Sequence, residues 1–149
     1  MDLFNRQGAL MALGHLGRGW NFPIEPDAAT SALGYAADEQ KIQQAIMIIL
    51  GTARGERVMR PEFGSRLREL VFAPLNSSTK SLVASAIADA LVRWEPRVDV
   101  LSVRTDDKAN SSGALVVNIE YRIRATNSVF NMVYPFYLRE GTNAAASTV

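Results

Sequence analysis

The sequence contains no cysteine and a single histidine, His15. Disulfides, thiolate nucleophiles and zinc–thiolate sites are therefore excluded, and one histidine cannot supply a histidine-rich metal site. A Ser–His relay would have to use His15, which lies in a glycine-rich segment without a nucleophile-elbow motif. We expect neither a metal nor a cofactor. No run of about 18 apolar residues occurs, so the sequence also predicts no membrane insertion.

An excess of charge of either sign is also lacking. The 149 residues carry 16 Lys+Arg and 15 Asp+Glu, for a formal net charge of +1. A protein that coats nucleic acid needs a concentrated positive field, so we expect no nucleic-acid partner. Thirteen of the basic residues are arginine and three are lysine. Arginine is enriched in the cores of protein interfaces, although a genomic composition bias gives the same pattern.

Residues 1–37 are interrupted by five glycines and two prolines, which predicts an N-terminal arm. Trp20 and Phe22 lie within this arm, and such aromatic residues dock either on the chain's own core or on a neighbouring chain. The folded domain is expected over 38–140. The small and polar residues of 141–149 predict a flexible tail.

Two amphipathic helices are predicted after the arm. The first covers 38–51, with Asp38 as its N-cap and Met47 widening its buried stripe. A charged loop follows it, and the second helix covers 77–94. The predicted core face of the second helix consists of Leu82, Ala86, Ile87, Ala90, Leu91 and Trp94.

Three strands are predicted in the last third of the chain, over 98–103, 114–124 and 129–139. In the second strand apolar and polar residues alternate from Leu115 onwards, which is typical of a sheet with one exposed face. Pro135 cannot donate to a β-ladder, so we expect the third strand at an edge. The predicted fold class is α+β: an N-terminal arm and two main helices packed on a small antiparallel sheet that ends in a C-terminal β-hairpin.

Carboxylates are the catalytic group that the composition allows, because a glycosidase needs only a pair of them. The candidates are Glu56 with Glu62, or Asp38 and Asp89 with Glu95. Five arginines lie between residues 54 and 68, and cations stabilise a charged carboxylate, whereas a general acid must be protonated. Ion pairing is therefore the preferred interpretation of this segment, and the alternative is a lysozyme-like peptidoglycan hydrolase.

Four sequence blocks carry a resemblance to a known family. They are GRGWNFP (17–23), EQKIQQAIMIILGTARGERVMRPEFGSRLRELVF (39–72), WEPR (94–97) and IEYRIRATNSVFNMVYPFYL (119–138). In this order and spacing they resemble the small baseplate wedge protein of contractile phage tails and related injection systems. That protein is also regarded as the sheath initiator, and it was historically labelled lysozyme-like.

The resemblance implies a structural, non-enzymatic role. A member of this family links the baseplate wedge to the first sheath ring and templates sheath assembly by β-strand addition. The implied partners are the sheath protein and the larger wedge proteins, with six copies near the inner tube or hub and assembly in the bacterial cytoplasm. A phage tail, a tailocin, a type VI-like system and an extracellular injection particle remain open, as does a scaffold domain unrelated to such machines.

The resemblance also implies interface residues. Glu95, Pro96 and Arg97 match the triplet that contacts the larger wedge proteins, with Pro96 holding two charges apart toward a partner. The alternative is a helix stop with two exposed charges. An exposed Arg97 contributes little to stability, so its replacement by alanine is expected to leave the fold nearly unchanged. The expected sheath interface on the edge hairpin comprises Val129, Asn131, Val133 and Tyr137.

The GERVMRPEFG block is interpreted as an architectural loop rather than an active site. Its glycines allow tight turns and its proline stiffens the segment. Met59 and Phe63 are expected to enter the core, and the two central arginines to pair with Glu56, Glu62 or Glu95. The loop residues are Gly55, Glu56, Arg57, Arg60, Pro61, Phe63 and Gly64.

Overall fold

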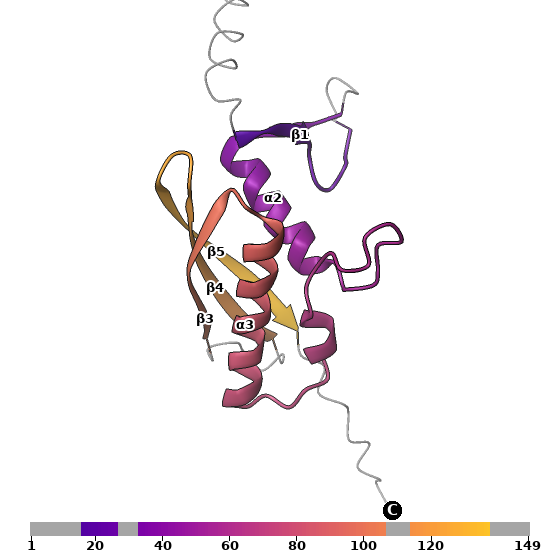
Figure 1. Cartoon of the computed structure of the whole chain (residues 1–149), viewed down its shortest axis with the longest axis vertical. Helices are drawn as coiled ribbons and strands as arrows, with labels where there is room; N and C mark the ends of the chain where they lie inside the picture. Colours follow the sequence, from indigo (N-terminus) through magenta and orange to yellow (C-terminus); the bar gives the residue numbers. More distant parts are fainter. Residues whose placement is uncertain (1–15, 27–32, 107–113, 138–149) are drawn as a thin grey trace, which may run out of the picture.

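The computed structural model describes residues 16–26, 33–106 and 114–137. Its elements follow the predicted order of arm, helix, charged loop, second helix and three strands (Figure 1). Two short strands in the arm are additional, and the predicted tail lies outside the described residues. The elements are β1 (Arg18–Trp20), β2 (Tyr35–Ala37), α2 (Asp38–Gly51), the 3-10 helix η2 (Leu67–Leu70), α3 (Ser77–Trp94), β3 (Val98–Asp106), β4 (Ala114–Ile123) and β5 (Ser128–Tyr137).

β4 is the middle strand of a three-stranded antiparallel sheet with the order β3–β4–β5. β5 pairs with β4 from its first residue to its last, so it is an edge strand of this sheet, as Pro135 predicts. The predicted α+β fold with one exposed sheet face is confirmed. The buried side chains of β4 are Leu115, Val117, Ile119, Tyr121 and Ile123, which alternate with partly exposed ones.

β3 lies at the opposite edge, and a β-bulge interrupts its pairing with β4 between Val100 and Ser102. The bulge inserts Leu101, whose side chain is exposed. It shifts the alternation by one residue, so Val103 rather than Ser102 packs on the core together with Val100. The shift explains why the apolar residues of this strand depart from a strict period of two.

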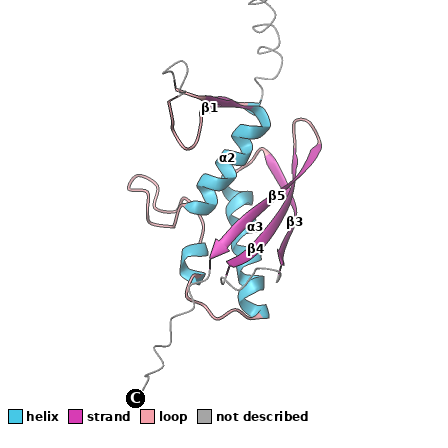
Figure 2. Ribbon diagram, turned by 180° about the vertical axis from the view of Figure 1, so that it is seen from behind, coloured by secondary structure: helices cyan, strands magenta, loops and turns pink. Residues whose placement is uncertain are grey.

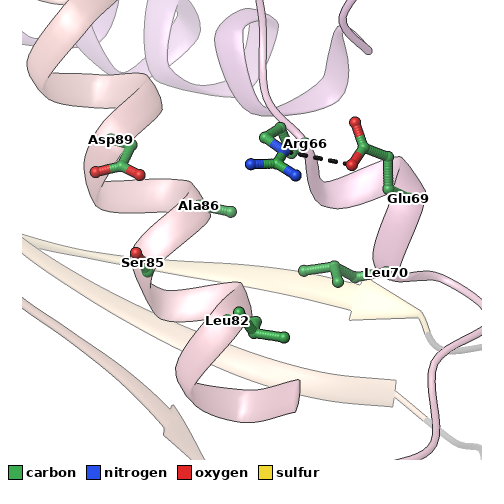
Figure 3. A pocket seen from close by; sticks show the side chains of 7 residues that line it. All are labelled: Arg66, Glu69, Leu70, Leu82, Ser85, Ala86 and Asp89. Atoms are coloured by element: carbon green, nitrogen blue, oxygen red, sulfur yellow. Dashed lines mark hydrogen bonds and ion pairs between the residues drawn. The ribbon is translucent and has the colours of Figure 1, made fainter. Parts of the chain in front are cut away.

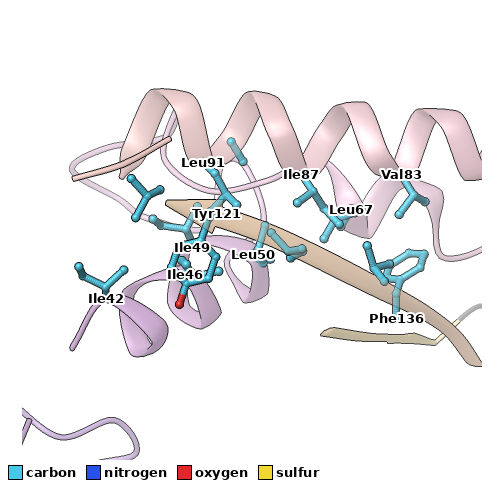
Figure 4. Packing of buried hydrophobic residues seen from close by; sticks show 14 of the residues in the cluster. Ile42, Ile46, Ile49, Leu50, Leu67, Val83, Ile87, Leu91, Tyr121 and Phe136 are labelled. Atoms are coloured by element: carbon cyan, nitrogen blue, oxygen red, sulfur yellow. The ribbon is translucent and has the colours of Figure 1, made fainter. Parts of the chain in front are cut away.

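Both helices pack on the same face of the sheet, and the hydrophobic core lies between these layers (Figures 2 and 4). The side-chain oxygen of Asn76 accepts a hydrogen bond from the backbone N–H of Thr79 at 2.8 Å and so caps α3. Burial of apolar surface between the layers is the main source of stability. The helical core residues are Ile42, Ile46, Ile49, Leu50, Leu67, Val83, Ile87, Ala90 and Leu91.

Three expectations about the helices are wrong. Leu82 is 53% exposed, and Val83 is buried instead, because Val83 shares a helix face with Ile87 and Ala90. Met47 is 40% exposed, because it lies outside the buried stripe of α2 that Ile42, Ile46, Ile49 and Leu50 form. Asp38 is the first helical residue, with a φ of 55°, and Ala37 occupies the N-cap position without a side-chain hydrogen bond.

The arm is folded back onto the start of α2. β1 pairs with β2, with Trp20 opposite Tyr35, and Lys41 of α2 donates to the carbonyl of Trp20 at 2.6 Å. Leu16 is buried in the core, whereas Trp20 and Phe22 are each about half exposed. The interpretation that these two aromatic side chains dock on the chain's own core is therefore wrong.

The core placement of α3 is tested with two variants of the same helix. Ile87→Ala removes a fully buried side chain and should lower the free energy of unfolding by about 2–5 kcal/mol. Leu82→Ala truncates an exposed side chain and should lower it by less than about 1 kcal/mol. Denaturant unfolding measures both values, and similar losses would contradict the assigned core face.

Candidate interaction surfaces

The turn after α3 holds a buried ion pair. The backbone N–H of Glu95 donates to the carbonyl of Leu91 at 2.9 Å, and the Glu95 side chain is only 4% exposed. Two residues later, Arg97 donates from Nε and Nη2 to the two carboxylate oxygens, each at 2.6 Å. Burial of a carboxylate carries a desolvation penalty, and this bidentate geometry offsets it. The hydrogen bonds from the guanidinium to Glu95 raise the pKa of Arg97 further, so the cation is permanent.

Arg97 also joins distant parts of the chain. Its Nη1 donates to the carbonyl of Leu16 at 2.7 Å, and its own carbonyl accepts from the backbone N–H of Arg124 at 3.0 Å. The expectation that Pro96 holds Glu95 and Arg97 apart is therefore wrong, because the turn brings the two side chains together. The expectation of an exposed Arg97 is wrong as well: its side chain is 33% exposed, and Pro96 is the exposed member of the triplet.

Backbone hydrogen bonds close the GERVMRPEFG loop at its base and near its tip. The N–H of Ser65 donates to the carbonyl of Thr52 at 2.9 Å, and the N–H of Gly55 donates to the carbonyl of Pro61 at 2.7 Å. Gly64 has a φ of 101°, and a Cβ there would lie 2.3 Å from the carbonyl oxygen of Thr52. Only glycine fits this position, which supports the predicted tight turn.

Aromatic contacts connect this loop to the end of α3. Arg57 lies over the ring of Phe63 at 4.5 Å from its centroid, and the rings of Phe63 and Trp94 have centroids 5.2 Å apart. Phe63 packs against the core as predicted. The predicted pairing of the loop arginines with Glu95 is wrong, because both oxygens of that carboxylate bind Arg97.

The tip of the loop projects away from the body of the molecule (Figure 1). Val58 and Met59 are 94% and 91% exposed, so the expectation that Met59 enters the core is wrong. Glu56 stabilises the base of the loop instead of its tip, because it accepts a hydrogen bond from the backbone N–H of Ala53 at 2.8 Å and lies 3.9 Å from Arg68. The loop is thus an internally bonded projection with an apolar tip.

Three of the four residues expected at the sheath interface lie on the exposed side of β5. Val129 and Val133 are 54% and 57% exposed, and Asn131 lies exposed between them. The intervening residues of β5 face the helices and pack on the core. Tyr137 ends the strand, and its side chain lies outside what the structure describes.

A charge cluster on the outer face of the sheet was not expected from the sequence. Asp99 of β3 accepts hydrogen bonds from Arg122 at 3.0 Å and from Arg124 at 2.7 Å. Hydrogen bonding to these two guanidinium groups lowers the pKa of Asp99 below its ordinary value. The polar alternation of β4 was a visible signal, but the strand register that brings Asp99 opposite Arg122 was not.

Two hollows were also not indicated by the sequence. One of about 160 Å³ lies between η2 and α3, where Leu70 and Leu82 approach it from opposite sides (Figure 3). The ion pair of Arg66 and Glu69, at 3.3 Å, lies on its rim. The other, of about 470 Å³, lies beside β5 and the arm.

Within the described ranges, no group of three or more His, Asp or Glu side chains is placed to hold a metal ion. No helix in the same part of the chain is long and apolar enough to span a membrane. Among the carboxylates considered for hydrolysis, Glu95 is buried, and Arg97 occupies both of its oxygens.

An edge strand, a projecting loop and an ion-paired turn around one small core define an α+β interaction domain. The family model described as "Baseplate wedge protein gp25" matches residues 36–128. The chain therefore belongs to the baseplate wedge protein gp25 family. It is a structural component of a contractile-tail baseplate.

Individual relatives agree with this assignment. Baseplate protein W of Escherichia phage P2 is 31% identical over 98 residues, which cover 66% of this chain and 84% of that protein. A Geobacter sulfurreducens protein, whose crystal structure is described as a candidate tail lysozyme, is 48% identical with a TM-score of 0.68, over 73% of this chain and 98% of that one. A chain of the anti-feeding prophage baseplate, 19% identical, has a TM-score of 0.57 over 86% and 90% of the two chains and shows the fold alone.

The ion pair predicts a large effect of Arg97→Ala on stability. The variant leaves Glu95 buried without its cation and should lower the free energy of unfolding by about 3 kcal/mol. Glu95→Gln in the same chain should restore part of the loss, because a buried neutral amide costs less than a buried charge. Urea unfolding compares these variants with Arg66→Ala, which breaks an exposed pair and should cost less than about 1 kcal/mol. An Arg97→Ala effect no larger than that control would contradict the structural role.

The Asp99 cluster predicts a contribution to stability that depends on pH. A carboxylate whose pKa falls on folding stabilises the fold above its ordinary pKa of 3.8, and the contribution disappears as the pH falls through the lower folded value. Asp99→Asn should therefore destabilise the protein at neutral pH and progressively less in acid. Denaturant unfolding across this pH range measures the difference, and a pH-independent difference would contradict the assignment. The double replacement Arg122→Gln and Arg124→Gln should remove the same pH dependence.

Proposed function

We propose that the chain is a non-enzymatic connector that links the baseplate wedge to the first sheath ring and templates the sheath by β-strand addition at β5. The observation that carries the proposal is the geometry of this edge. β5 is ten residues long, pairs with β4 throughout, and lies at the end of the sheet. An open edge of this kind is a template for a strand of another chain.

The two edges of the sheet are not equivalent. β3 carries a bulge that disrupts the regular spacing of its pairing groups, whereas the register of β5 on β4 is continuous. Bulges protect sheet edges against the addition of further strands. Pro135 lacks an N–H donor, so an added strand pairs with the part of β5 that precedes it. These features favour β5 as the sheath edge.

The turn at Glu95, Pro96 and Arg97 is the proposed contact with the larger wedge proteins. The described contacts of Arg97 use three of the five N–H groups of its guanidinium, which leaves two outside these contacts. A partner therefore meets an exposed proline and a fixed, partly exposed cation, which suits a carboxylate or a backbone carbonyl. Because the cation is already held in place, binding loses little side-chain entropy.

A hydrolytic role is disfavoured by the same pair. A glycosidase acid must carry a proton, but the buried carboxylate of Glu95 accepts two hydrogen bonds from a permanent cation. Glu56, another of the carboxylates considered for hydrolysis, lies 3.9 Å from Arg68 and accepts a backbone hydrogen bond from Ala53. In the assembled particle we place six copies around the inner tube or hub, with assembly in the bacterial cytoplasm.

Amide hydrogen exchange tests strand addition directly. Addition of the purified, unassembled cognate sheath protein to the full chain should slow exchange of alternate β5 amides, because these N–H groups of an edge strand point away from β4. The edge amides of β3 serve as the internal control and should not change. Sheath binding without protection of β5, or no binding at all, would overturn the proposal.

A further inference from the structure

An apolar groove of about 470 Å³ runs beside the edge of β5. Its walls come from three segments: Phe22 and Pro23 of the arm, Met47 of α2, and Met132 and Val133 of β5. The other lining residues are three glutamines of α2, so the lining carries no charged side chain. The groove therefore accepts apolar surface and penalises a buried charge.

The groove lies at the edge of the strand rather than on one of its faces. Met132 points toward the helices and packs on the core, whereas Val133 is 57% exposed on the opposite face. Both line the hollow, so it opens at the edge that separates the two faces. A strand added to β5 lies about 4.8 Å from it, and its helix-facing side chains would enter this space.

The far wall of the groove is already held in place. Gln44 of α2 donates to the side-chain oxygen of Asn21 at 3.2 Å, and Asn21 donates through its backbone N–H to the carbonyl of Gly34 at 2.9 Å. Lys41 donates to the carbonyl of Trp20 at 2.6 Å. These bonds fix the arm on α2 immediately before Phe22, so the groove is formed before any partner arrives.

We propose that this groove makes strand addition sequence-specific, and that its occupant is a large apolar side chain of the sheath segment paired with β5, opposite Met132. The inference rests on the proposed strand addition and adds a specificity to it. The incoming strand must be amphipathic, with apolar residues toward α2 and polar residues on the outer face. The lining of thioether, phenyl and proline groups suits an unbranched or aromatic apolar side chain.

The test uses Met47, which lines the groove and is 40% exposed, so the full chain tolerates its replacement. Met47→Glu should weaken the affinity for the unassembled cognate sheath protein by at least about tenfold, measured by calorimetry. Met47→Leu should keep the affinity within about threefold. The matched control is Val92→Glu, which places the same charge at an exposed apolar position of α3. Thermal unfolding confirms that each variant is folded.

The outcomes separate the groove from strand addition. Loss of affinity in Met47→Glu alone, with β5 amides still protected at saturating sheath protein, supports the groove. Equal affinities of Met47→Glu and Val92→Glu, together with protected β5 amides, overturn the proposed role of the groove but not the proposed strand addition. Unprotected β5 amides in the unmodified complex overturn both.

Discussion

The relative positions of the chain's parts depend on the buried pair of Glu95 and Arg97. Once the carboxylate is buried at the end of α3, a cation must lie beside it, and the tight turn through Pro96 brings Arg97 there. The same guanidinium binds the carbonyl of Leu16, and the Arg97 carbonyl receives the N–H of Arg124. One electrostatic requirement thus sets α3, the sheet and the base of the arm relative to one another, and the arm in turn forms one wall of the groove beside β5.

Much of the fold was predictable because it follows local periodicity. The alternation of apolar and polar residues predicted the buried face of β4, and the helical spacing of apolar residues predicted α2 and α3. The errors arise where tertiary packing determines which side chains are buried. The offset between Leu82 and Val83 depends on how α3 meets the sheet, and the position of Met59 depends on the path of a loop. Periodicity cannot predict these two outcomes, since Leu82, Val83 and Met59 are all apolar.

The candidate site was less predictable than the fold. The resemblance pointed to Glu95 and Arg97, but no sequence pattern indicated that they bind each other, because charges two residues apart meet only when a turn folds them together. The groove joins Phe22, Met47 and Met132, which are far apart in the chain. Such a juxtaposition follows from strand register and arm docking, both of which are long-range properties.

The exposed apolar side chains are consistent with a protein that is completed by assembly. Single exposed apolar residues are common, and several here lie on features that face outward: the loop tip at Val58 and Met59, the groove wall at Phe22, and the outer side of β5. An open, regular edge is an aggregation hazard for an isolated domain. A bulge protects β3, whereas β5 has only Pro135 near its end to limit pairing. Retention of one open edge while the other is interrupted is what a template requires, because it admits one strand in one place.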